Sequence, residues 1–466
     1  MMTQTERRAT ASLAAVFALR LLGLFMIYPV FAPYARGLHG ATPVGIGLAL
    51  GAYGLTQGLL QIPFGLLSDR IGRKTMISIG LMLFAAGSVV AARATSIDGV
   101  LFGRILQGAG AVGSVLLALV ADLTREEVRT RAMAVVGMTI GLSFVVAIVA
   151  GPALAAITGV PGIFWLTALF ALSGIAITQG IVPTPARVTR HRDAEAVPAL
   201  FARVLRNGEL LRLDFAIFVL HAILTASFLA VPLVLARTFH LGGNSDWMIY
   251  LPVILISVAL MVPAIILAEK RGHMKEAFIA AIAVLAGSLL VLTFRQQSAV
   301  AVVIALVGFF AAFNVMEAML PSLVTKIAPA DAKGTATGIY SSFQFLGIFA
   351  GGAGGGLASA LGGPRAVFVL ATLLALVWLA VALTMRRPAR SANYLVHLGT
   401  LGQHEAEALA ARLTVLPGVT EAVIEAEDGT AYLKIDRSRF DPAALARIVG
   451  ESPKATPDSM TSARSR

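Results

Sequence analysis

The sequence predicts an all-α membrane protein with twelve transmembrane helices in two halves of six, followed by a small α+β domain. Three observations predict this fold class. Hydrophobic residues make up 57% of the chain and charged residues only 13%, a balance far from that of soluble domains. Apolar runs of bilayer-spanning length recur along most of the chain. The composition then changes after Arg390 to short alternating segments that are typical of strands.

The apolar runs define the predicted membrane helices. Each run is long enough to cross the hydrocarbon core while every backbone group is hydrogen-bonded within the helix. We expect helices at residues 12–34, 43–65, 75–93, 97–121, 132–157, 160–182, 213–237, 246–268, 276–294, 298–324, 334–361 and 364–385. No convincing cleavage site follows the first run, so we expect a retained helix rather than a signal peptide. The chain has no cysteine, which excludes disulfides and thiolate metal sites.

The distribution of basic residues predicts the orientation. Lys and Arg collect in the terminal segments and in the alternate loops that follow the second, fourth, sixth, eighth and tenth helices. Because such residues stay in the cytoplasm, both termini are expected on the cytoplasmic side of a bacterial inner membrane. This bias also explains most of the formal net charge of +12, so the charge does not indicate a nucleic-acid partner.

Two loops resemble one another at an offset of 200 residues, which predicts an internal repeat. The loop after the second helix reads "PFGLLSDRIGRK" and the loop after the eighth reads "PAIILAEKRGHMK". The matched pairs are Pro63 with Pro263, Asp69 with Glu269, Arg70 with Lys270 and Gly72 with Gly272. We therefore expect two six-helix halves, 1–182 and 213–386, joined by a polar cytoplasmic linker, 183–212, with an amphipathic piece at 198–212. Parallel halves around a substrate path are typical of alternating-access transporters.

Three motifs carry a resemblance to a known family. The loop "GLLSDRIGRK" matches the signature of the major facilitator superfamily with Gly65, Asp69, Arg70, Gly72, Arg73 and Lys74. The fourth helix carries "GRILQGAGAVGS", which resembles the embedded-arginine motif of that superfamily at Arg104 and Gln107. Gly141, Gly151 and Pro152 in the fifth helix resemble the antiporter motif of the drug:proton branch, although Ala155 and Ala156 replace its closing glycine pair. The resemblance implies the major facilitator fold and proton-coupled export.

Longer segments resemble the YajR group of transporters within that branch. These segments are "LRLLGLFMIYPV", "GLTQGLLQIPFGLLSDRIGRK", "FNVMEAMLPSL" and the C-terminal "AYLKID". The resemblance covers essentially the whole chain, and it implies a proton-driven efflux transporter with a small cytoplasmic domain after the last helix.

The signature loop is expected to act as a conformational latch. Asp69 lies beyond the end of the second helix, where the N-terminus of another helix could offer it free N–H groups. The resemblance implies that this helix is the eleventh, beginning around Lys333 to Thr335. Arg73 is expected to pair with Asp122, and Arg131 to join the network. Such contacts would close the cytoplasmic side; the alternative is that the basic residues only enforce topology.

Glu317 and His221 are the candidates for proton coupling. Glu317 lies in the apolar run "FFAAFNVMEAMLPSLV", where burying an ionised carboxylate costs roughly 2.5–3.5 kcal/mol. Such a group favours its protonated form away from water, as a proton carrier requires. His221 in the seventh helix is a candidate partner, because an unperturbed imidazole titrates near neutral pH. The alternatives are a structural carboxyl hydrogen-bonded to Asn314 or a neighbouring helix, and a structural histidine.

Polar and aromatic residues within the helices are candidates for lining a substrate cavity. Their alternative role is hydrogen bonding between helices. They are Arg20, Tyr28, Tyr53, Gln57, Gln61, Arg104, Gln107, Asn314, Tyr340 and Gln344. The glycine-rich "GIFAGGAGGGLASALGG" has no Lys-Ser/Thr ending and no preceding strand, so we expect close helix packing there rather than a phosphate loop.

The last part of the chain predicts a βαββα domain of ferredoxin-like layout over residues 394–450. Strands are expected at "YLVHLG", "VTEAVIEAE" and "TAYLKIDR", and helices at "HEAEALAARLTVL" and "DPAALARIVG". The absence of a C-x-x-C pair excludes the metal-transfer chemistry of similar modules. No last strand is evident in 451–466, which we expect to be a disordered tail, so the domain could take a dimer partner or a regulatory ligand.

Three function classes follow from the sequence. A proton-coupled exporter of small hydrophobic or amphipathic molecules explains the embedded acid, the latch and the antiporter motif. A proton-coupled uptake symporter of a small metabolite shares the fold, and a non-transporting sensor would signal through the C-terminal domain. No nucleophile–base arrangement stands out, so we expect no enzyme, no cofactor and no metal, with the membrane, protons and a small molecule as partners.

Overall fold

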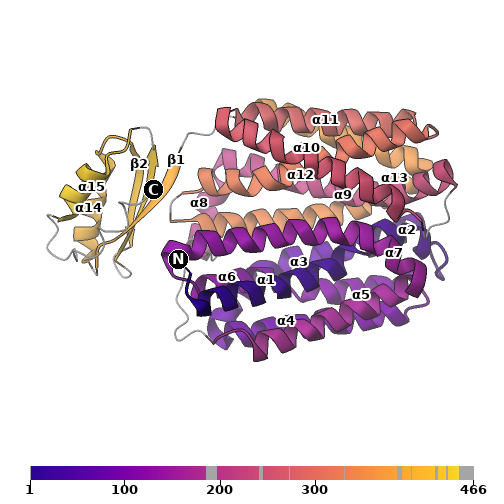
Figure 1. Cartoon of the computed structure of the whole chain (residues 1–466), viewed down its shortest axis with the longest axis horizontal. Helices are drawn as coiled ribbons and strands as arrows, with labels where there is room; N and C mark the ends of the chain where they lie inside the picture. The colour runs from indigo at the N-terminus through magenta and orange to yellow at the C-terminus, as the bar shows by residue number, and fades with distance from the viewer. Residues whose placement is uncertain are drawn as a thin grey trace.

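The protein is a bundle of long helices with a small α/β domain at one end (Figure 1). The computed structural model describes residues 2–184, 197–240, 245–271, 273–329, 331–385, 391–399, 401–425, 429–436 and 439–450. The N-terminus lies at the same end of the bundle as the C-terminal domain. We name this the domain end and the opposite one the far end.

The N-terminal half contains seven helices that make six crossings. They are α1 (Gln4–Phe25), α2 (Tyr28–Ala35), α3 (Pro43–Ile71), α4 (Arg73–Arg93), α5 (Ile97–Ala109), α6 (Gly113–Asp122) and α7 (Glu126–Gly180). α1 and α2 together form the first crossing, as α5 and α6 form the fourth. Thr42 and Ser96 cap α3 and α5 by accepting hydrogen bonds from the backbone N–H groups of Gly45 and Gly99.

The C-terminal half begins after a short linker helix. Residues 198–205 form a 3-10 turn (Pro198–Leu200) and α8 (Phe201–Leu205). The membrane helices are α9 (Gly208–Phe239), α10 (Trp247–Arg271), α11 (Met274–Phe294), α12 (Ala299–Ile327) and α13 (Lys333–Leu383). The predicted amphipathic piece at 198–212 is therefore wrong in extent, because Asn207 caps α9 and starts that helix earlier than expected. The rest of the linker, 185–196, lies outside the described residues.

The predicted number of crossings is confirmed when two long helices are divided at their glycines. Among the described residues, ten segments are long and apolar enough to span a membrane, and two of them run for 50 and 51 residues. α7 is interrupted at Gly159 and α13 at Gly362 and Gly363, where Gly159 and Gly363 have φ values of 68° and 62°. Positive φ is readily adopted only by glycine. Each of these helices thus makes two crossings, which gives twelve.

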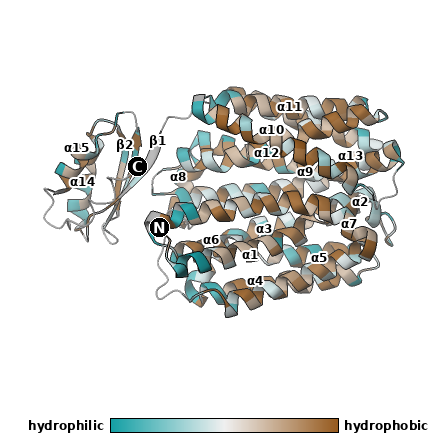
Figure 2. Ribbon diagram, viewed as in Figure 1, coloured by the Kyte–Doolittle hydropathy of each residue, from teal (hydrophilic) through white to brown (hydrophobic). Residues whose placement is uncertain are grey.

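The surface of the bundle is apolar, as a lipid-facing surface must be. Ile157 and Leu361 are about four-fifths exposed, and Leu142 is 64% exposed. Hydrophilic residues gather at the domain end of the bundle, and hydrophobic residues cover the length between the two ends (Figure 2). Because hydrocarbon solvates such side chains, their exposure is consistent with a membrane protein and needs no partner protein.

The two halves meet along α3 and α13 through glycines. Gly47, Gly51 and Gly54 of α3 lie directly against the α13 backbone between Phe345 and Gly356. A Cβ atom on Gly47 would collide with the carbonyl oxygen of Gly352 and lie 2.7 Å from Gly356 Cα. The glycine-rich run therefore serves close helix packing, as the sequence predicts.

The C-terminal domain has the predicted βαββα order. Its elements are β1 (Ser391–His397), α14 (Gln403–Thr414), β2 (Val419–Glu425), β3 (Thr430–Asp436) and α15 (Pro442–Gly450). The sheet is antiparallel with strand order β1-β3-β2. Its core contains Leu409, Leu413, Leu433 and Leu445, which join α14 and α15 to the sheet. The expected disordered tail, 451–466, lies outside the described residues.

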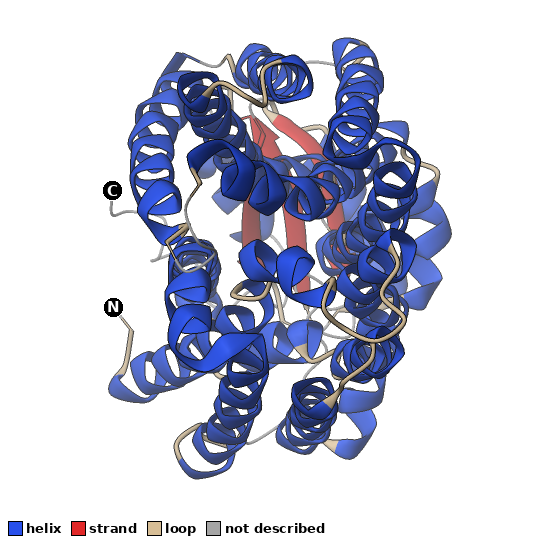
Figure 3. Ribbon diagram, turned by 90° about the vertical axis from the view of Figure 1, so that its right-hand side faces the viewer, coloured by secondary structure: helices blue, strands red, loops and turns tan. Residues whose placement is uncertain are grey.

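The other face of this sheet is turned to the bundle. Lys434 of β3 donates hydrogen bonds of 3.1 Å to the carbonyl oxygens of Ile327 and Ala328, at the end of α12. Arg203 of α8 lies 2.9 Å from Asp331, just before α13, and 3.1 Å from Glu421 of β2. Seen along the helices, the strands lie behind them and within the outline of the bundle (Figure 3). The domain thus contacts the loop between α12 and α13.

Candidate functional site

The centre of the C-terminal half contains a cluster of three polar side chains from three helices. The Gln344 amide nitrogen of α13 lies 2.9 Å from His221 Nε2 of α9 and 3.3 Å from Glu317 Oε1 of α12. His221 Nε2 lies 3.8 Å from Glu317 Oε2. The structure therefore places the two proton-coupling candidates side by side, with Gln344 between them.

The hydrogen bonds of this cluster indicate one tautomer of His221. Its Nδ1 lies 3.3 Å from the carbonyl oxygen of Ile217, one turn earlier, which can only accept. The Nδ1 atom therefore carries a proton, and Nε2 of a neutral ring accepts from the Gln344 amide. The same amide nitrogen has a second hydrogen for Glu317, so one glutamine orients both titratable groups.

Glu317 is less enclosed than His221. The Glu317 side chain is 33% exposed and the His221 side chain 3%. Among the described residues, no lysine or arginine pairs with Glu317. Among the described residues the Nδ2 atom of Asn314 has no hydrogen-bond partner, and Glu317 is bonded to Gln344 of a neighbouring helix, which is the other form of the structural alternative.

Aromatic rings border the cluster from both halves of the protein. The Phe313 ring of α12 lies 5.8 Å from the His221 ring, and the Phe144 ring of α7 lies 5.4 Å from Phe313. Tyr28 of α2 lies 5.4 Å from Phe228 of α9, closer to the far end. The halves are thus in contact through aromatic side chains above and beside the cluster.

The polar candidates of the N-terminal half bond to one another, except Tyr28, whose hydroxyl has no hydrogen-bond partner among the described residues. Arg20 Nη2 lies 2.6 Å from the Tyr53 hydroxyl and 2.7 Å from Gln57 Oε1, and Gln57 continues to Gln61 at 2.5 Å. Arg104 donates to Gln107 at 2.9 Å, and its guanidinium carbon lies 5.2 Å from the Tyr53 ring centre.

Both arginines are at most 2% exposed, and neither pairs with an acid among the described residues. The geometry of these side chains is that of interhelical hydrogen bonding. A contact of any of them with substrate stays a prediction.

The signature loop forms a buried ion pair at the domain end. Arg73 Nε lies 3.1 Å from Asp122 Oδ2, with the two side chains 1% and 0% exposed, so the expected pair is present. Arg73 also bonds to Ser68 Oγ at 2.7 Å and to Asp69. Gly72 has a φ of 94°, which explains a glycine between α3 and α4.

The remaining basic residues of this region lie around the pair. Lys74 donates to the carbonyl oxygen of Val182 at 2.9 Å, beyond the end of α7, where positive charge is favourable. Arg70 and Arg131 are exposed. The membership of Arg131 in the network stays a prediction.

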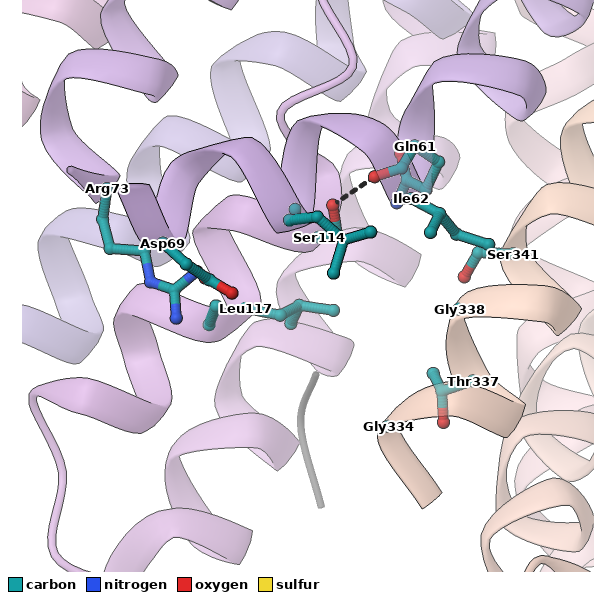
Figure 4. A pocket seen from close by; sticks show the side chains of 13 residues that line it. Gln61, Ile62, Asp69, Arg73, Ser114, Leu117, Gly334, Thr337, Gly338 and Ser341 are labelled. Carbon is teal, nitrogen blue, oxygen red and sulfur yellow. Dashed lines mark hydrogen bonds and ion pairs between the residues drawn. The ribbon is translucent and has the colours of Figure 1, made fainter. Parts of the chain in front are cut away.

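The predicted contact of Asp69 with the start of α13 is not made in this conformation. Asp69 bonds to Arg73, and among the described residues it makes no bond to α13. A pocket of about 530 Å³, counting the solvent at its mouth, separates the two elements. Figure 4 shows Asp69 and Arg73 on one wall, and Gly334, Thr337 and Ser341 of α13 on the other. The halves therefore touch from Gly47 to Gly58 and separate towards the domain end.

The first turn of α13 is instead bonded to the linker. Thr335 Oγ1 accepts a hydrogen bond of 2.9 Å from the backbone N–H of Val197. This hydroxyl is fully buried. The helix end that was expected to meet Asp69 thus contacts the segment that leads to α8.

The residues of the antiporter motif have unequal surroundings. A Cβ atom on Gly151 would collide with the carbonyl oxygen of Met26, at the break between α1 and α2, so glycine permits close packing there. Pro152 follows inside α7. Gly141 has no atom within 4 Å of an added Cβ, and packing does not explain it.

Comparisons with known proteins decide the family. The model of the Major Facilitator Superfamily matches residues 13–352 and 215–397. The chain belongs to the major facilitator superfamily. It is 43% identical over 436 residues to the inner membrane transport protein YajR of Escherichia coli (strain K12), across 93% of this chain and 95% of that protein. It is also 23% identical over 373 residues to multidrug resistance protein 1 of Bacillus subtilis (strain 168), across 79% and 94% of the two chains.

Solved structures agree on the fold of this superfamily member. A bacterial homologue of the human lysosomal transporter Spinster, in an inward-facing and occupied conformation, superposes with a TM-score of 0.66 at 14% identity. The match covers 83% of this chain and 98% of that one. The protein is therefore a multi-pass membrane transporter, and its relatives support an inner-membrane location.

Sequence reasoning missed two sets of residues. Asp214 of α9 is 2% exposed. A helix beginning at 213 would place Asp214 at its exposed end, where an acid is not costly, whereas the helix begins at Gly208. Arg203, Asp331, Glu421 and Lys434 join the C-terminal domain to the bundle. The only signal for Asp214 was an acid seven residues before His221, and no signal in the sequence relates Arg203 to Glu421.

Proposed function

We propose that this transporter is a proton-coupled exporter of small hydrophobic or amphipathic molecules. The observation that carries the proposal is the cluster of His221, Gln344 and Glu317 in the centre of the C-terminal half. Glu317 lies ten residues before the end of α12, which is about 15 Å along a helix. A carboxylate at that depth without a cation is expected to take a proton whenever water is excluded.

Protonation of Glu317 would change the hydrogen bonds of the cluster. The ionised carboxylate only accepts, and it takes the Gln344 amide as donor. The protonated acid gains an O–H group, which can donate a hydrogen bond to the unprotonated Nε2 atom of His221. Because Nε2 has one lone pair, this bond displaces the Gln344 amide from His221, and the neutral carboxyl accepts from that amide more weakly than the carboxylate does. One proton thus loosens α13 and joins α12 to α9, and so it favours a different arrangement of these helices.

The pocket at the domain end indicates how access to the substrate path could alternate. In this conformation the halves touch near the far end and separate near Asp69. Closing the pocket would bring α13 against Asp69, where the free N–H groups of its first turn can bind the carboxylate. We propose that the latch forms in that second state, and that the substrate path opens alternately to the two ends.

The direction of transport rests on orientation and relatives. The positive-inside rule assigns the domain end to the cytoplasm. Relatives named multidrug resistance proteins support export of amphipathic compounds, and the packing of Gly151 fits the antiporter motif. Protons entering from outside would then leave on the cytoplasmic side as substrate is exported.

Proteoliposomes that contain the purified full chain test the proposal. We would follow ethidium as the amphipathic probe and internal pH with a trapped dye, under an imposed pH gradient. Native protein should move ethidium against its gradient in exchange for protons. Glu317→Gln should lose this coupling and still exchange ethidium for ethidium. Asp98→Asn, an exposed acid at the start of α5, is the matched control.

Each other result identifies an alternative. Cotransport of ethidium and protons in one direction would make the protein a symporter. Coupling that persists in Glu317→Gln would refute the assigned role of that residue. Absence of flux for ethidium and for a panel of amphipathic probes would favour a sensor.

A further inference from the structure

The C-terminal half contains a buried carboxylate that the proposed mechanism does not use. Asp214 of α9 is 2% exposed, and its Oδ2 atom has no hydrogen-bond partner among the described residues. No lysine or arginine among the described residues pairs with Asp214. An acid buried at membrane depth without a cation is costly, and such residues generally mark proton or ion pathways.

A structural role as a helix cap does not explain Asp214. Asn207 already caps α9, and its side chain accepts from the backbone N–H groups of Glu209 and Leu210 at 3.0 and 3.3 Å. Asp214 lies beyond the first turn, where the N–H groups are bonded within the helix. The nearby Arg212 pairs with Glu209 at 2.7 Å.

Asp214 lies on the same face of α9 as His221. The two residues are seven positions apart, which places them two turns and about 10 Å from one another along the helix. Asp214 is the nearer of the two to the domain end, because α9 begins at Gly208. The acid therefore lies between the central cluster and the domain end.

Tyr340 of α13 is a buried polar group that interacts electrostatically with both acids. Its hydroxyl is buried without a hydrogen-bond partner in the described structure. The side chain lies within electrostatic range of both Glu317 and Asp214. Tyr340 also lies one turn before Gln344, so the polar groups alternate between α9, α12 and α13 on the way to the domain end.

We infer that Asp214 is a second proton-binding residue, which receives the proton from Glu317 and releases it at the domain end. The inference rests on the proposed proton coupling. The transfer requires a movement that brings the Tyr340 hydroxyl within hydrogen-bond distance of both carboxyls, which it does not contact in this conformation. The Glu317 carboxyl then gives its proton to the Tyr340 oxygen while the Tyr340 hydroxyl gives its own proton to the Asp214 carboxylate. One proton moves, the negative charge passes from Asp214 to Glu317, and Tyr340 is unchanged. Tyr340 is the titratable group that faces Asp214 from α13, and Glu317 is the next one, from α12.

Infrared difference spectroscopy of the full chain in lipid tests this without a substrate. A protonated carboxyl has a carbonyl band that disappears when the acid ionises, so a pH titration reports each buried acid. Native protein should show one such band for Glu317 and one for Asp214, and the variant Asp246→Asn identifies the band of the other buried acid of this half, Asp246. Glu317→Gln should remove one, and Asp214→Asn the other. Asp214→Glu should keep both bands with the second shifted, and the exposed-acid variant Asp98→Asn should leave both unchanged.

The outcomes separate the inference from the proposed function. Two bands that persist in Asp214→Asn would overturn the inference and leave the role of Glu317 intact. Loss of neither band in either variant would overturn both. Tyr340→Phe should keep both bands, because it leaves both carboxyls in place. Among the described residues Asp214 makes no bond through Oδ2, so we expect its variants to fold. If Asp214→Asn does not fold, the shifted band of Asp214→Glu still tests the inference.

Discussion

Replacing Gly47 by alanine should shift the transporter towards the state that is closed at the domain end. The added Cβ would meet the carbonyl oxygen of Gly352 and the Cα atom of Gly356, which belong to the other half of the protein. Backbone atoms cannot rotate away, so α3 and α13 must separate at the far end. The substitution therefore penalises only conformations in which these two glycine surfaces touch.

The size of the shift follows from the cost of overpacking. Inserting a methyl group into a well-packed contact costs about 1–3 kcal/mol. If the whole cost falls on one of two conformations, their ratio changes by roughly 5- to 150-fold. Alanine is otherwise a better helix former than glycine by about 1 kcal/mol, so the protein as a whole should not lose stability.

Distances between spin labels measure this shift. The chain has no cysteine, so pairs can be introduced without removing any. Exposed positions 93 and 295 report the far end, and exposed positions 7 and 325 report the domain end. In the alanine variant the far-end distance should lengthen and the domain-end distance should shorten.

The matched control for this experiment is Gly287→Ala, because an added Cβ there meets no atom within 4 Å. Distance distributions that match those of the native protein in Gly47→Ala would refute the reasoning. They would mean that α3 and α13 stay in contact through both conformations. A shift of equal size in the control would show that helix propensity, rather than the contact, decides the equilibrium.

Three further predictions concern stability and the C-terminal domain. Burial raises the pKa of Asp246 to about 6, so the native state carries a costly charge above that pH. At about pH 8 the free energy of unfolding of Asp246→Asn should exceed that of the native protein by up to about 3 kcal/mol. Near pH 4 the two proteins should unfold at the same temperature, because Asp246 is then protonated in the native state. Asp122→Asn removes one of the carboxylates that balance the buried charge of Arg73 and should lower the free energy of unfolding by about 3 kcal/mol, measured by thermal unfolding. Asp98→Asn should leave that free energy almost unchanged. Lys434→Met removes two bonds to the end of α12 and should increase proteolysis between the bundle and the C-terminal domain. Unchanged proteolysis would contradict this and would assign the attachment to the contact of Arg203 with Glu421.

The sequence was sufficient for the helices and for the two titratable residues deep within them, Glu317 and His221. Glu317 and His221 were identifiable because charged or titratable groups in apolar helices need a reason. The bridging position of Gln344 was not predictable, since it depends on how α13 is rotated against α9 and α12. Asp214 was missed because the cap at Asn207 moves the helix start. The contact of Asp69 with α13 is not seen for another reason: it depends on which conformation the protein adopts.

α13 is the element through which protonation can act on the gate. Its first turn is bonded to the linker through Thr335, and its next turns line the pocket opposite Asp69. Further along, Tyr340 interacts electrostatically with Glu317 and Asp214, and Gln344 bonds to His221 and Glu317. A proton on Glu317 weakens the hold of Gln344, and the same rigid helix carries that change about 16 Å to its first turn. The proton site and the gate therefore need no separate pathway between them, because one helix belongs to both.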